Sequence, residues 1–477
     1  MTNKNQPIAI FSVIYVIYTI LISLITPTTY LDSWWVLVMS WIGIFSFCYI
    51  LNSYRKASGQ WLSLYSIFVI LCYLFNYGQC LFWAFGVHLE QEIGTSLLYG
   101  YYGTNDAELF RAQAYFLCCM HGIHAAYMNT MKTQSNLSSV SDSAVIPNDW
   151  YNRYVFKASK YIAFLVMPVT LMLLLNNISV ASTSGYKDLY YGDQAGGGAT
   201  IMTFSNMFFV CIIGLLVGSR YAKKQMLICY ALFAIYILLD LSTGDRGGWF
   251  YRLLILFWMH HYFYKKFTKG QILRLGIMGF GALFVIQGIV AMRNFGVSIE
   301  SVQEAMSDTE VNPLVAMVFE MGGQMKINIM AVNHDINYPY GNSIFLGLLA
   351  MVTMKIPALL GISYEPITSW FSDKFLQIDY GAGFSLFGEM AINFGVHLAP
   401  LAFIVFGLIV TNILNVAERP GALNAKQLLF AIGSASFLFG SIRNTFHDLF
   451  KYWFIGLVLY FVLMKIINVF SSRKQEI

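Results

Sequence analysis

Charged residues are scarce in this chain of 477 residues, where Asp, Glu, Lys and Arg together make up 11% of the sequence. Hydrophobic residues make up 57%, and the mean hydropathy is +0.60. Because roughly a quarter of the residues in soluble domains are charged, the composition excludes a soluble protein and indicates a polytopic membrane protein. The net charge of +5 does not indicate a nucleic-acid partner, because membrane proteins concentrate Lys and Arg in their cytoplasmic loops.

Cysteine is also rare, and the pattern of the seven cysteines excludes two kinds of site. All seven fall inside apolar runs, and none has the Cys-x-x-Cys spacing of a redox or metal motif. The sequence therefore predicts neither a disulfide framework nor a thiolate metal site.

Apolar runs of membrane-spanning length dominate the rest of the chain. A span needs about 20 predominantly apolar residues, and somewhat fewer at the short end. Twelve runs satisfy this rule, at 8–25, 34–51, 62–86, 109–128, 160–180, 199–218, 226–241, 248–264, 275–292, 384–414, 428–442 and 452–470. We therefore expect an all-α membrane protein with about twelve transmembrane helices. Its expected parts are a membrane domain at 1–292, an extracytoplasmic loop at 293–383 and a second membrane domain at 384–477.

The charges between the spans predict the orientation of the chain. Basic residues gather in alternate loops, among them Arg55 with Lys56 and the cluster at 265–274. The positive-inside rule places these loops and both termini in the cytoplasm, and the loop at 293–383 on the outer face. The run at 8–25 is expected to be a retained span, not a cleaved signal peptide.

The outer loop at 293–383 is rich in acidic and aromatic residues, which is typical of surfaces that bind sugars or other polar ligands. Its segment 344–361 is apolar but interrupted by a lysine and a proline, so we expect an interfacial or re-entrant helix there. Two more short helices are expected to open at Pro313 and Pro366, since proline is favoured in the first turn.

Ionisable groups at membrane depth are costly and often functional. The stretch from Asp240 to Trp249, DLSTGDRGGW, lies between two short apolar runs. Its glycines permit a tight reversal, and the next helix would begin near Gly247, so that Asp245 and Arg246 flank a helix N-terminus suited to an anion. An ordinary hairpin turn with one snorkelling arginine explains the same residues equally well.

Arginines also stand at the outer ends of several predicted spans. Arg293 closes the ninth span, and Arg443 precedes the last one, four residues before His447 on the same helical face. Arginines that converge from separate helices favour a phosphate or pyrophosphate ligand. For Arg111, Arg252 and Lys451 the favoured interpretation is that the side chain snorkels to the interface.

Glu389 is a further anomaly, because it falls about one turn into a predicted span, four residues before Asn393. Two roles are open for it: a structural partner of one of the arginines, or a general base. His121 and His124 lie inside the fourth predicted span, and we expect them to be packing residues.

The order of these features resembles the Wzy-type oligosaccharide repeat-unit polymerases, the O-antigen and capsule polymerases. The shared features are the Thr-Gly-x-Arg-Gly hairpin at 243–247, Arg293 at the end of a span, and a large outer loop with the element YPYGNS at 338–343. The stretch SLFGEMAINFG at 385–395 is the most specific of them. The chain departs from the family pattern at Ile392, where members often carry tyrosine.

The resemblance implies a GT-C-like membrane glycosyltransferase on the outer face of the bacterial cytoplasmic membrane. It would transfer the growing glycan from undecaprenyl pyrophosphate to a new lipid-linked repeat unit. The expected partners are the undecaprenyl-pyrophosphate-linked oligosaccharide and the bilayer, with a chain-length regulator and a flippase as further candidates. No cofactor is expected, and no metal ion either, because the outer segments contain no Asp-x-Asp pair.

This chemistry suggests roles for the residues singled out above. A pyrophosphate leaving group needs positive charge at the outer membrane surface. The candidates for that charge are Arg246, Arg293 and Arg443. A base must take the proton of the acceptor hydroxyl. The candidates, in order, are Glu389, His447 and Asp245. The candidates for binding the acceptor sugars are Tyr340, Trp370, Tyr380 and Asn393.

Three other functions remain open from the sequence. An O-antigen ligase would use the same lipid donor with a lipid A core acceptor, but the signature around Glu389 favours a polymerase. A flippase for the same lipid-linked oligosaccharide would show internal repeats and ionisable groups near the midplane, neither of which the sequence has. A non-catalytic scaffold is disfavoured by the clustered arginines.

Overall fold

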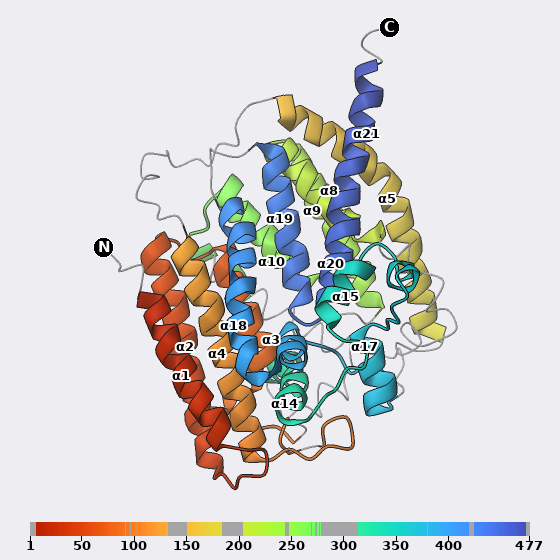
Figure 1. The fold of residues 1–477 in the computed structure, drawn as a ribbon. Coiled ribbons are helices and arrows are strands. Elements are labelled where there is room, and N and C mark those ends of the chain that lie inside the picture. The colour runs from red at the N-terminus through yellow and green to blue at the C-terminus, as the bar shows by residue number, and fades with distance from the viewer. Residues whose placement is uncertain are drawn as a thin grey trace. The chain divides into compact units, whose positions relative to one another are not determined.

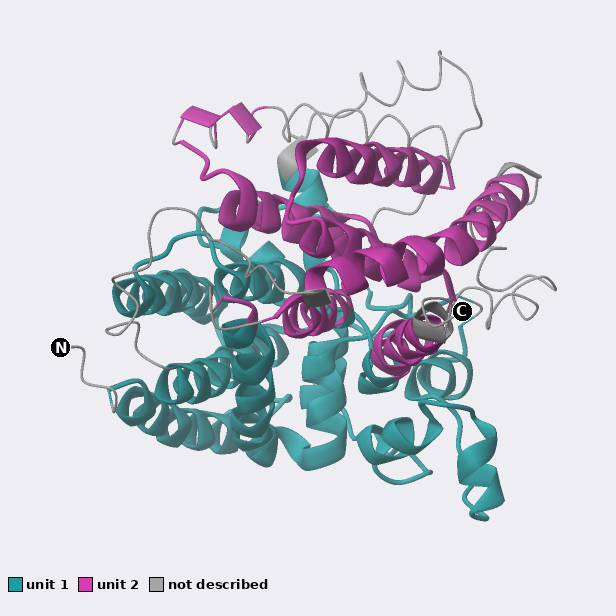
Figure 2. Cartoon of the chain, turned by 90° about the horizontal axis from the view of Figure 1, so that it is seen from above, with its two compact units in different colours: residues 1–139, 315–416, 441–450 teal, residues 140–314, 417–440, 451–477 magenta. Residues whose placement is uncertain are grey.

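The computed structural model describes residues 6–90, 92–95, 97–131, 150–183, 204–243, 248–268, 270–271, 274–275, 277, 313–378, 380–418 and 424–473. All the named elements within these ranges are helices, and one isolated bridge joins Leu98 to Tyr102 (Figure 1). The chain divides into two compact units, coloured separately in Figure 2. Unit 1 comprises 1–139, 315–416 and 441–450, and unit 2 comprises 140–314, 417–440 and 451–477.

Unit 1 contains four long N-terminal helices, the short helices of the predicted outer loop and one long helix that follows them. The first four are α1 (Gln6–Leu24), α2 (Ser33–Ser58), α3 (Leu64–Trp83) and α4 (Asp106–Thr130). The later ones are α13 (Pro313–Gly322), α14 (Met325–Asn333), α15 (Ser343–Ala350), α16 (Lys355–Leu359), α17 (Ile367–Trp370), the π-helix η3 (Phe371–Leu376) and α18 (Leu386–Ala417). The first turns of α20 (Phe446–Trp453) also belong to this unit.

Unit 2 contains the remaining helices. They are α5 (Trp150–Thr183), α8 (Met207–Gly218), α9 (Lys223–Ser242), α10 (Phe250–Met259), the π-helix η2 (His260–Tyr264), most of α19 (Ala425–Ser441), the π-helix η4 (Phe454–Val458) and α21 (Leu459–Arg473).

Helices of spanning length occur where the apolar runs predict them. Seven described segments are long and apolar enough to cross a membrane: Gln6–Leu24, Ser33–Ser58, Leu64–Trp83, Asn152–Ala181, Lys223–Ser242, Leu386–Ala417 and Phe446–Val469. Helices α4, α8, α19 and the pair α10–η2 occupy four more of the predicted runs. The predicted span at 275–292 lies almost entirely outside the described residues, so the number twelve stays a prediction. These helices are those of a multi-pass membrane protein.

Helix α4 is the centre of unit 1, and this explains why it is less apolar than the other long helices. It packs against α1, α2 and α14, and every residue from Ala107 to Tyr127 is buried. His121 Nε2 lies 2.8 Å from Ser46 Oγ, and His124 Nε2 lies 2.8 Å from Ser53 Oγ. Because these contacts satisfy the imidazoles inside the protein, both histidines have the surroundings of the packing residues that we expected.

Helix α18 is broken at Gly395, which the sequence did not predict. Gly395 has φ 71° and ψ 162°, a conformation that glycine adopts without strain. Helix α1 contacts the start of the second part, since Tyr18 Oη donates to Val396 O at 2.7 Å and Tyr15 Oη donates to His397 O at 3.0 Å. The carbonyl of Val396 has no helical partner, because Pro400, four residues further on, has no N–H. The break separates a short first part of α18, which carries Glu389, from the long second part.

The described part of the predicted outer loop contains the short helices that were expected, with one difference in detail. The apolar segment 344–361 forms two short helices, α15 and α16, rather than one. Helix α13 opens at Pro313 as predicted. Pro366 is the N-cap of α17, one residue before the first turn where we expected it, because its ψ of 136° is not helical.

Candidate functional site

Glu389 is completely buried, and protein donors occupy both oxygens of its carboxylate. Ser343 Oγ donates to Oε1 at 2.7 Å, and the backbone amide of Phe446 donates to Oε2 at 2.7 Å. Ser343 is the first residue of α15 and Phe446 is the first residue of α20. The carboxylate therefore lies between the N-terminal ends of two helices, where negative charge is favoured.

Asn393 supports the same arrangement one turn further along α18. Its Oδ1 accepts the backbone N–H of Ser343 at 2.7 Å, and its Nδ2 donates to Ser343 Oγ at 2.8 Å and to Glu389 O at 2.7 Å. Among the described residues the partners of Glu389 are thus Ser343, Asn393 and Phe446, and not the arginine that the sequence suggested.

Thr445 lies in the turn that leads into α20, and His447 and Asp448 lie in the first turn of that helix. Thr445 Oγ1 accepts the amide of Asp448 at 3.2 Å and lies 2.9 Å from Asp448 Oδ2, so Thr445 and Asp448 cap the helix. His447 follows Phe446 in the first turn of α20 and is 6% exposed. The ring of Tyr364, which arrives from the outer loop, lies 5.8 Å from the ring of His447.

Tyr364 has a buried hydroxyl for which the described part of the protein offers no hydrogen-bond partner. Burial, and then the nearby carboxylates of Glu389 and Asp448, raise the pKa of Tyr364, so its hydroxyl stays protonated at neutral pH. A buried hydroxyl without a partner is costly. This phenol beside His447 is suited to a polar group of a ligand.

Arg443, in the same turn, is half-buried and has no acidic partner among the described residues. Its guanidinium carbon lies 5.6 Å from the ring centroid of Phe75 on α3. A guanidinium that is partly removed from water without an anion is a candidate for binding an anionic ligand.

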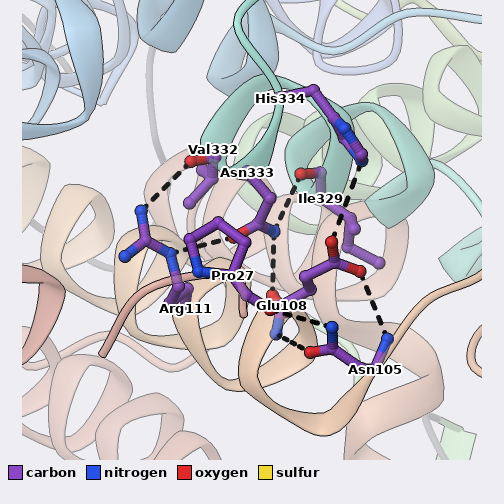
Figure 3. Close-up of polar contacts among 8 residues, drawn as sticks. All are labelled: Pro27, Asn105, Glu108, Arg111, Ile329, Val332, Asn333 and His334. Carbon is purple, nitrogen blue, oxygen red and sulfur yellow. Dashed lines mark hydrogen bonds and ion pairs between the residues drawn. The ribbon is translucent and has the colours of Figure 1, made fainter. Parts of the chain in front are cut away.

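Arg111 has the opposite surroundings, and the expectation that it snorkels is wrong. It is 7% exposed, and Figure 3 shows it among the ends of α4 and α14 and the chain after α1. Its Nη1 donates to Ile22 O at 2.8 Å and also to Ile25 O, its Nε donates to Asn333 Oδ1 at 2.9 Å, and its Nη2 donates to Val332 O at 3.4 Å. Arg111 thus satisfies carbonyls that the ends of α1 and α14 leave unpaired.

The same cluster in Figure 3 joins α14 to the start of α4. Asn105 and Glu108 form a capping box at the start of α4, and Asn105 Nδ2 donates to Pro27 O at 2.8 Å. Asn333 Nδ2 donates to the carbonyl of Glu108 at 3.0 Å, and His334 Nε2 lies 4.0 Å from Glu108 Oε1. We therefore regard this cluster as a structural junction.

Arg252 in unit 2 also differs from the expectation that it snorkels. It is 7% exposed, and it donates to Tyr236 Oη at 2.9 Å and to Asn206 Oδ1 at 3.0 Å. Tyr236 lies on α9 and Arg252 on α10, the two helices that flank the predicted hairpin. Arg252 is thus a packing residue of unit 2.

Two aromatic residues predicted to bind sugars lie together in the outer loop, but they differ in accessibility. Tyr338 lies 5.3 Å from the ring of Tyr340 and 5.3 Å from the ring of Trp370. Trp370 is buried, whereas Tyr340 is half-buried and its hydroxyl donates to Glu365 Oε2 at 3.1 Å. Trp370 therefore lies on the buried side of this aromatic cluster, and Tyr340 lies on its accessible side.

Lys374 lies on the same accessible side, because its ammonium group lies 2.6 Å from Glu365 Oε2 and 3.3 Å from Tyr340 Oη. The hydrogen bonds to Glu365 and Tyr340 raise the pKa of Lys374. Tyr380, the third predicted aromatic residue, is 37% exposed.

The remaining predicted site residues, Asp245, Arg246 and Arg293, lie outside the described residues. The structure brings Glu389 and Asn393 together around Ser343, and Glu389 also contacts the residue before His447. Arg443 lies in the turn before α20, with its guanidinium at the ring of Phe75. Ser343, Tyr364 and the amide of Phe446 belong to the same place and were not predicted. For Ser343 the available signal was its position at the end of the YPYGNS element.

The described residues contain no group of three or more His, Cys, Asp or Glu side chains that could hold a metal ion. A family model described as O-antigen polysaccharide polymerase Wzy matches residues 8–474, which is nearly the whole chain. No curated protein and no solved structure matches the chain significantly.

Proposed function

Because the chain belongs to the O-antigen polysaccharide polymerase Wzy family, we propose that it transfers a growing glycan from undecaprenyl pyrophosphate to a new lipid-linked repeat unit. The reaction takes place on the outer face of the cytoplasmic membrane. The protein is a GT-C-like glycosyltransferase with about twelve spans, and both of its termini lie in the cytoplasm. The acceptor hydroxyl attacks the anomeric carbon of the donor, the bond from that carbon to the pyrophosphate breaks, and the hydroxyl proton passes to a base.

The half-buried guanidinium of Arg443 is the observation that carries this proposal. It lacks an acidic partner among the described residues, and it lies in the turn before His447. The negative charge that develops on the leaving pyrophosphate would supply the missing partner, because electrostatic stabilisation acts where charge appears in the transition state. Arg246 and Arg293 are proposed to contribute in the same way.

The contacts of Glu389 favour His447 as the base. A general base must reach the acceptor hydroxyl, directly or through one water. The carboxylate of Glu389 is fully buried and accepts hydrogen bonds from protein donors on both oxygens, so we assign it a positioning role. His447 adjoins Tyr364, whose hydroxyl has no hydrogen-bond partner among the described residues and would bind the acceptor sugar at the same place. Tyr340 and Tyr380 are proposed to bind acceptor sugars further out, and no metal ion takes part.

The test begins with deletion of the gene from its host and electrophoresis of the surface polysaccharide. Anchored single repeat units without a ladder are expected, because export and attachment continue without polymerisation. Loss of all surface repeats would identify a transporter instead, free polymer that is never anchored would identify a ligase, and an unchanged ladder would refute the proposal.

Complementation then tests the site. Arg246→Ala, Arg293→Ala and Arg443→Ala, expressed singly in the deletion strain, are each expected to lower polymerisation about 100-fold, as the removal of one transition-state donor does. Protein amounts in the membrane are measured for each variant. Full ladders from all three variants would refute the assignment of these arginines.

A further inference from the structure

Helix α15 of the outer loop lies directly on the first turn of α20. A Cβ added to Gly347 would lie 3.0 Å from both Cα and Cβ of His447 and 3.2 Å from its N. Real Cβ atoms rarely approach backbone so closely, so the two helices touch at this point because position 347 has no side chain.

The N-terminal end of α15 is fixed at a second place, four residues earlier. The backbone N–H of Ser343 donates to Asn393 Oδ1, and the Ser343 hydroxyl donates to one carboxylate oxygen of Glu389. The other carboxylate oxygen of Glu389 accepts the backbone amide of Phe446. One buried carboxylate thus holds the N-terminal ends of α15 and α20 against each other. Hydrogen bonds to charged groups are about twice as strong as neutral ones, and more so in a buried site.

Only one face of α15 takes part in this contact. Its buried residues are Ser343, Leu346, Gly347 and Ala350, which recur at helical spacing. On its other side Phe345 and Leu348 are 58% and 43% exposed. The placement of α15 on α20 therefore depends on the face that carries Ser343 and Gly347.

We propose that Ser343 and Gly347 are positioning residues, which seat α15 on the first turn of α20 and thereby orient His447 for the transfer reaction. The inference rests on the proposed function and deepens it. It assigns to the outer loop a share in forming the reacting centre, in addition to the binding of sugars. The ring of Tyr364, from the same predicted loop, lies 5.8 Å from the ring of His447, so two segments of the loop contact this residue.

The variants follow from the two contacts. Ser343→Ala removes the hydroxyl that joins Glu389 to Asn393, and Ser343→Thr keeps a hydroxyl. Gly347→Ala forces the helices apart. Gly103→Ala is the matched control, because a Cβ there meets only Leu97 Cδ2 at 3.9 Å, an ordinary van der Waals contact.

The assay uses the purified full chain with lipid-linked repeat units extracted from the deletion strain, and rates are divided by the amount of monodisperse protein. Ser343→Ala and Gly347→Ala are expected to lower kcat by roughly 10- to 100-fold with little change in KM, since a small misplacement of a reacting group has effects of this size. Ser343→Thr is expected to recover most of the rate, and Gly103→Ala is expected to match the wild type.

A double-mutant cycle separates positioning from a general loss of fold. If Ser343 acts through His447, Ser343→Ala has little further effect on kcat in a His447→Ala background. Full multiplication of the two effects would overturn the proposal, as would wild-type kcat in both Ser343→Ala and Gly347→Ala. If Ser343→Ala does not give monodisperse protein, the same cycle with Gly347→Ala decides. An unchanged ladder in the deletion strain is a different result, because it would refute the proposed function itself.

Discussion

Two arginines of unit 1 show how differently a membrane protein can surround the same side chain. Arg111 donates to three backbone carbonyls and one side-chain amide, all at the ends of helices. Arg443 contacts an aromatic ring and has no acidic partner among the described residues. The sequence places both arginines near the ends of predicted spans, yet their surroundings indicate opposite roles.

The comparison shows that the number of N–H donors that the protein already occupies indicates the role of an arginine better than its depth in the membrane does. A guanidinium carries five N–H donors in a fixed arrangement. Where the protein occupies most of them, as at Arg111, the residue joins chain ends that would otherwise expose unpaired carbonyls to an apolar surrounding. Where the described residues occupy none of them, as at Arg443, a ligand with negative charge can complete the site.

The largest effects are expected from alanine at the two positions, where one substitution lowers stability and the other lowers activity. Arg111→Ala is expected to lower the free energy of unfolding by about 3 kcal/mol or more, because it leaves buried acceptors unsatisfied at about 1–3 kcal/mol each. Arg443→Ala is expected to leave stability nearly unchanged and to abolish the ladder. Thermal unfolding in detergent and the amount of membrane-inserted protein measure the first effect, and gel electrophoresis of the polysaccharide measures the second.

Lysine substitutions at Arg111 and Arg443 test whether a positive charge alone is sufficient at each position. Arg111→Lys keeps the charge but cannot reach acceptors on α1 and α14 at once, so it is expected to destabilise the protein almost as much as alanine does. Arg443→Lys keeps a cation for the ligand and is expected to retain part of the activity. A stable Arg111→Ala protein, or an unstable Arg443→Ala protein, would show that the contrast is mistaken.

A smaller effect is expected at Glu389, where glutamine distinguishes positioning from base catalysis. The amide oxygen of Glu389→Gln can still accept the amide of Phe446, and its NH₂ group can donate to Ser343 Oγ. A positioning role therefore predicts that activity falls by only about fivefold, in line with the loss of roughly 1 kcal/mol of interaction between the carboxylate and the helix end.

If Glu389 is the base, glutamine cannot take the proton, and kcat would fall about 100-fold or more. Glu389→Ala is the companion variant, since it removes both hydrogen bonds and is expected to be impaired under either role. The decisive measurement is the ratio of the activities of the two variants at equal amounts of folded protein.

Hydropathy predicted the helices well because a span is a local property of the sequence. The family was also predicted correctly, from motifs that keep their order along the chain. The break at Gly395 was not predicted, because a single glycine within an apolar run is compatible with an unbroken helix and only its backbone dihedral angles reveal the turn.

The partners of Glu389 could not be predicted for a different reason. They come from positions 46 and 57 residues away in the sequence, so no local pattern relates them. The surroundings of Arg111 were missed in the same way, since hydropathy gives the depth of a residue but not which helix ends meet there. Non-local contacts of this kind decide whether a polar residue is structural or functional.

The smallest effect is expected in the outer loop, at the exposed ion pair of Lys374 with Glu365. Hydrogen bonds to Glu365 and Tyr340 raise the pKa of Lys374, so the pair contributes stability at neutral pH and loses it only as the pH rises through the folded-state value in the alkaline range. Because the ammonium group is exposed, water and salt screen most of this contribution. Lys374→Ala is therefore expected to shift the unfolding midpoint slightly at neutral pH and not at all at strongly alkaline pH. A large, pH-independent loss of stability would mean that Lys374 contributes to the fold as Arg111 does. Exposure of the side chain would then not distinguish the two residues.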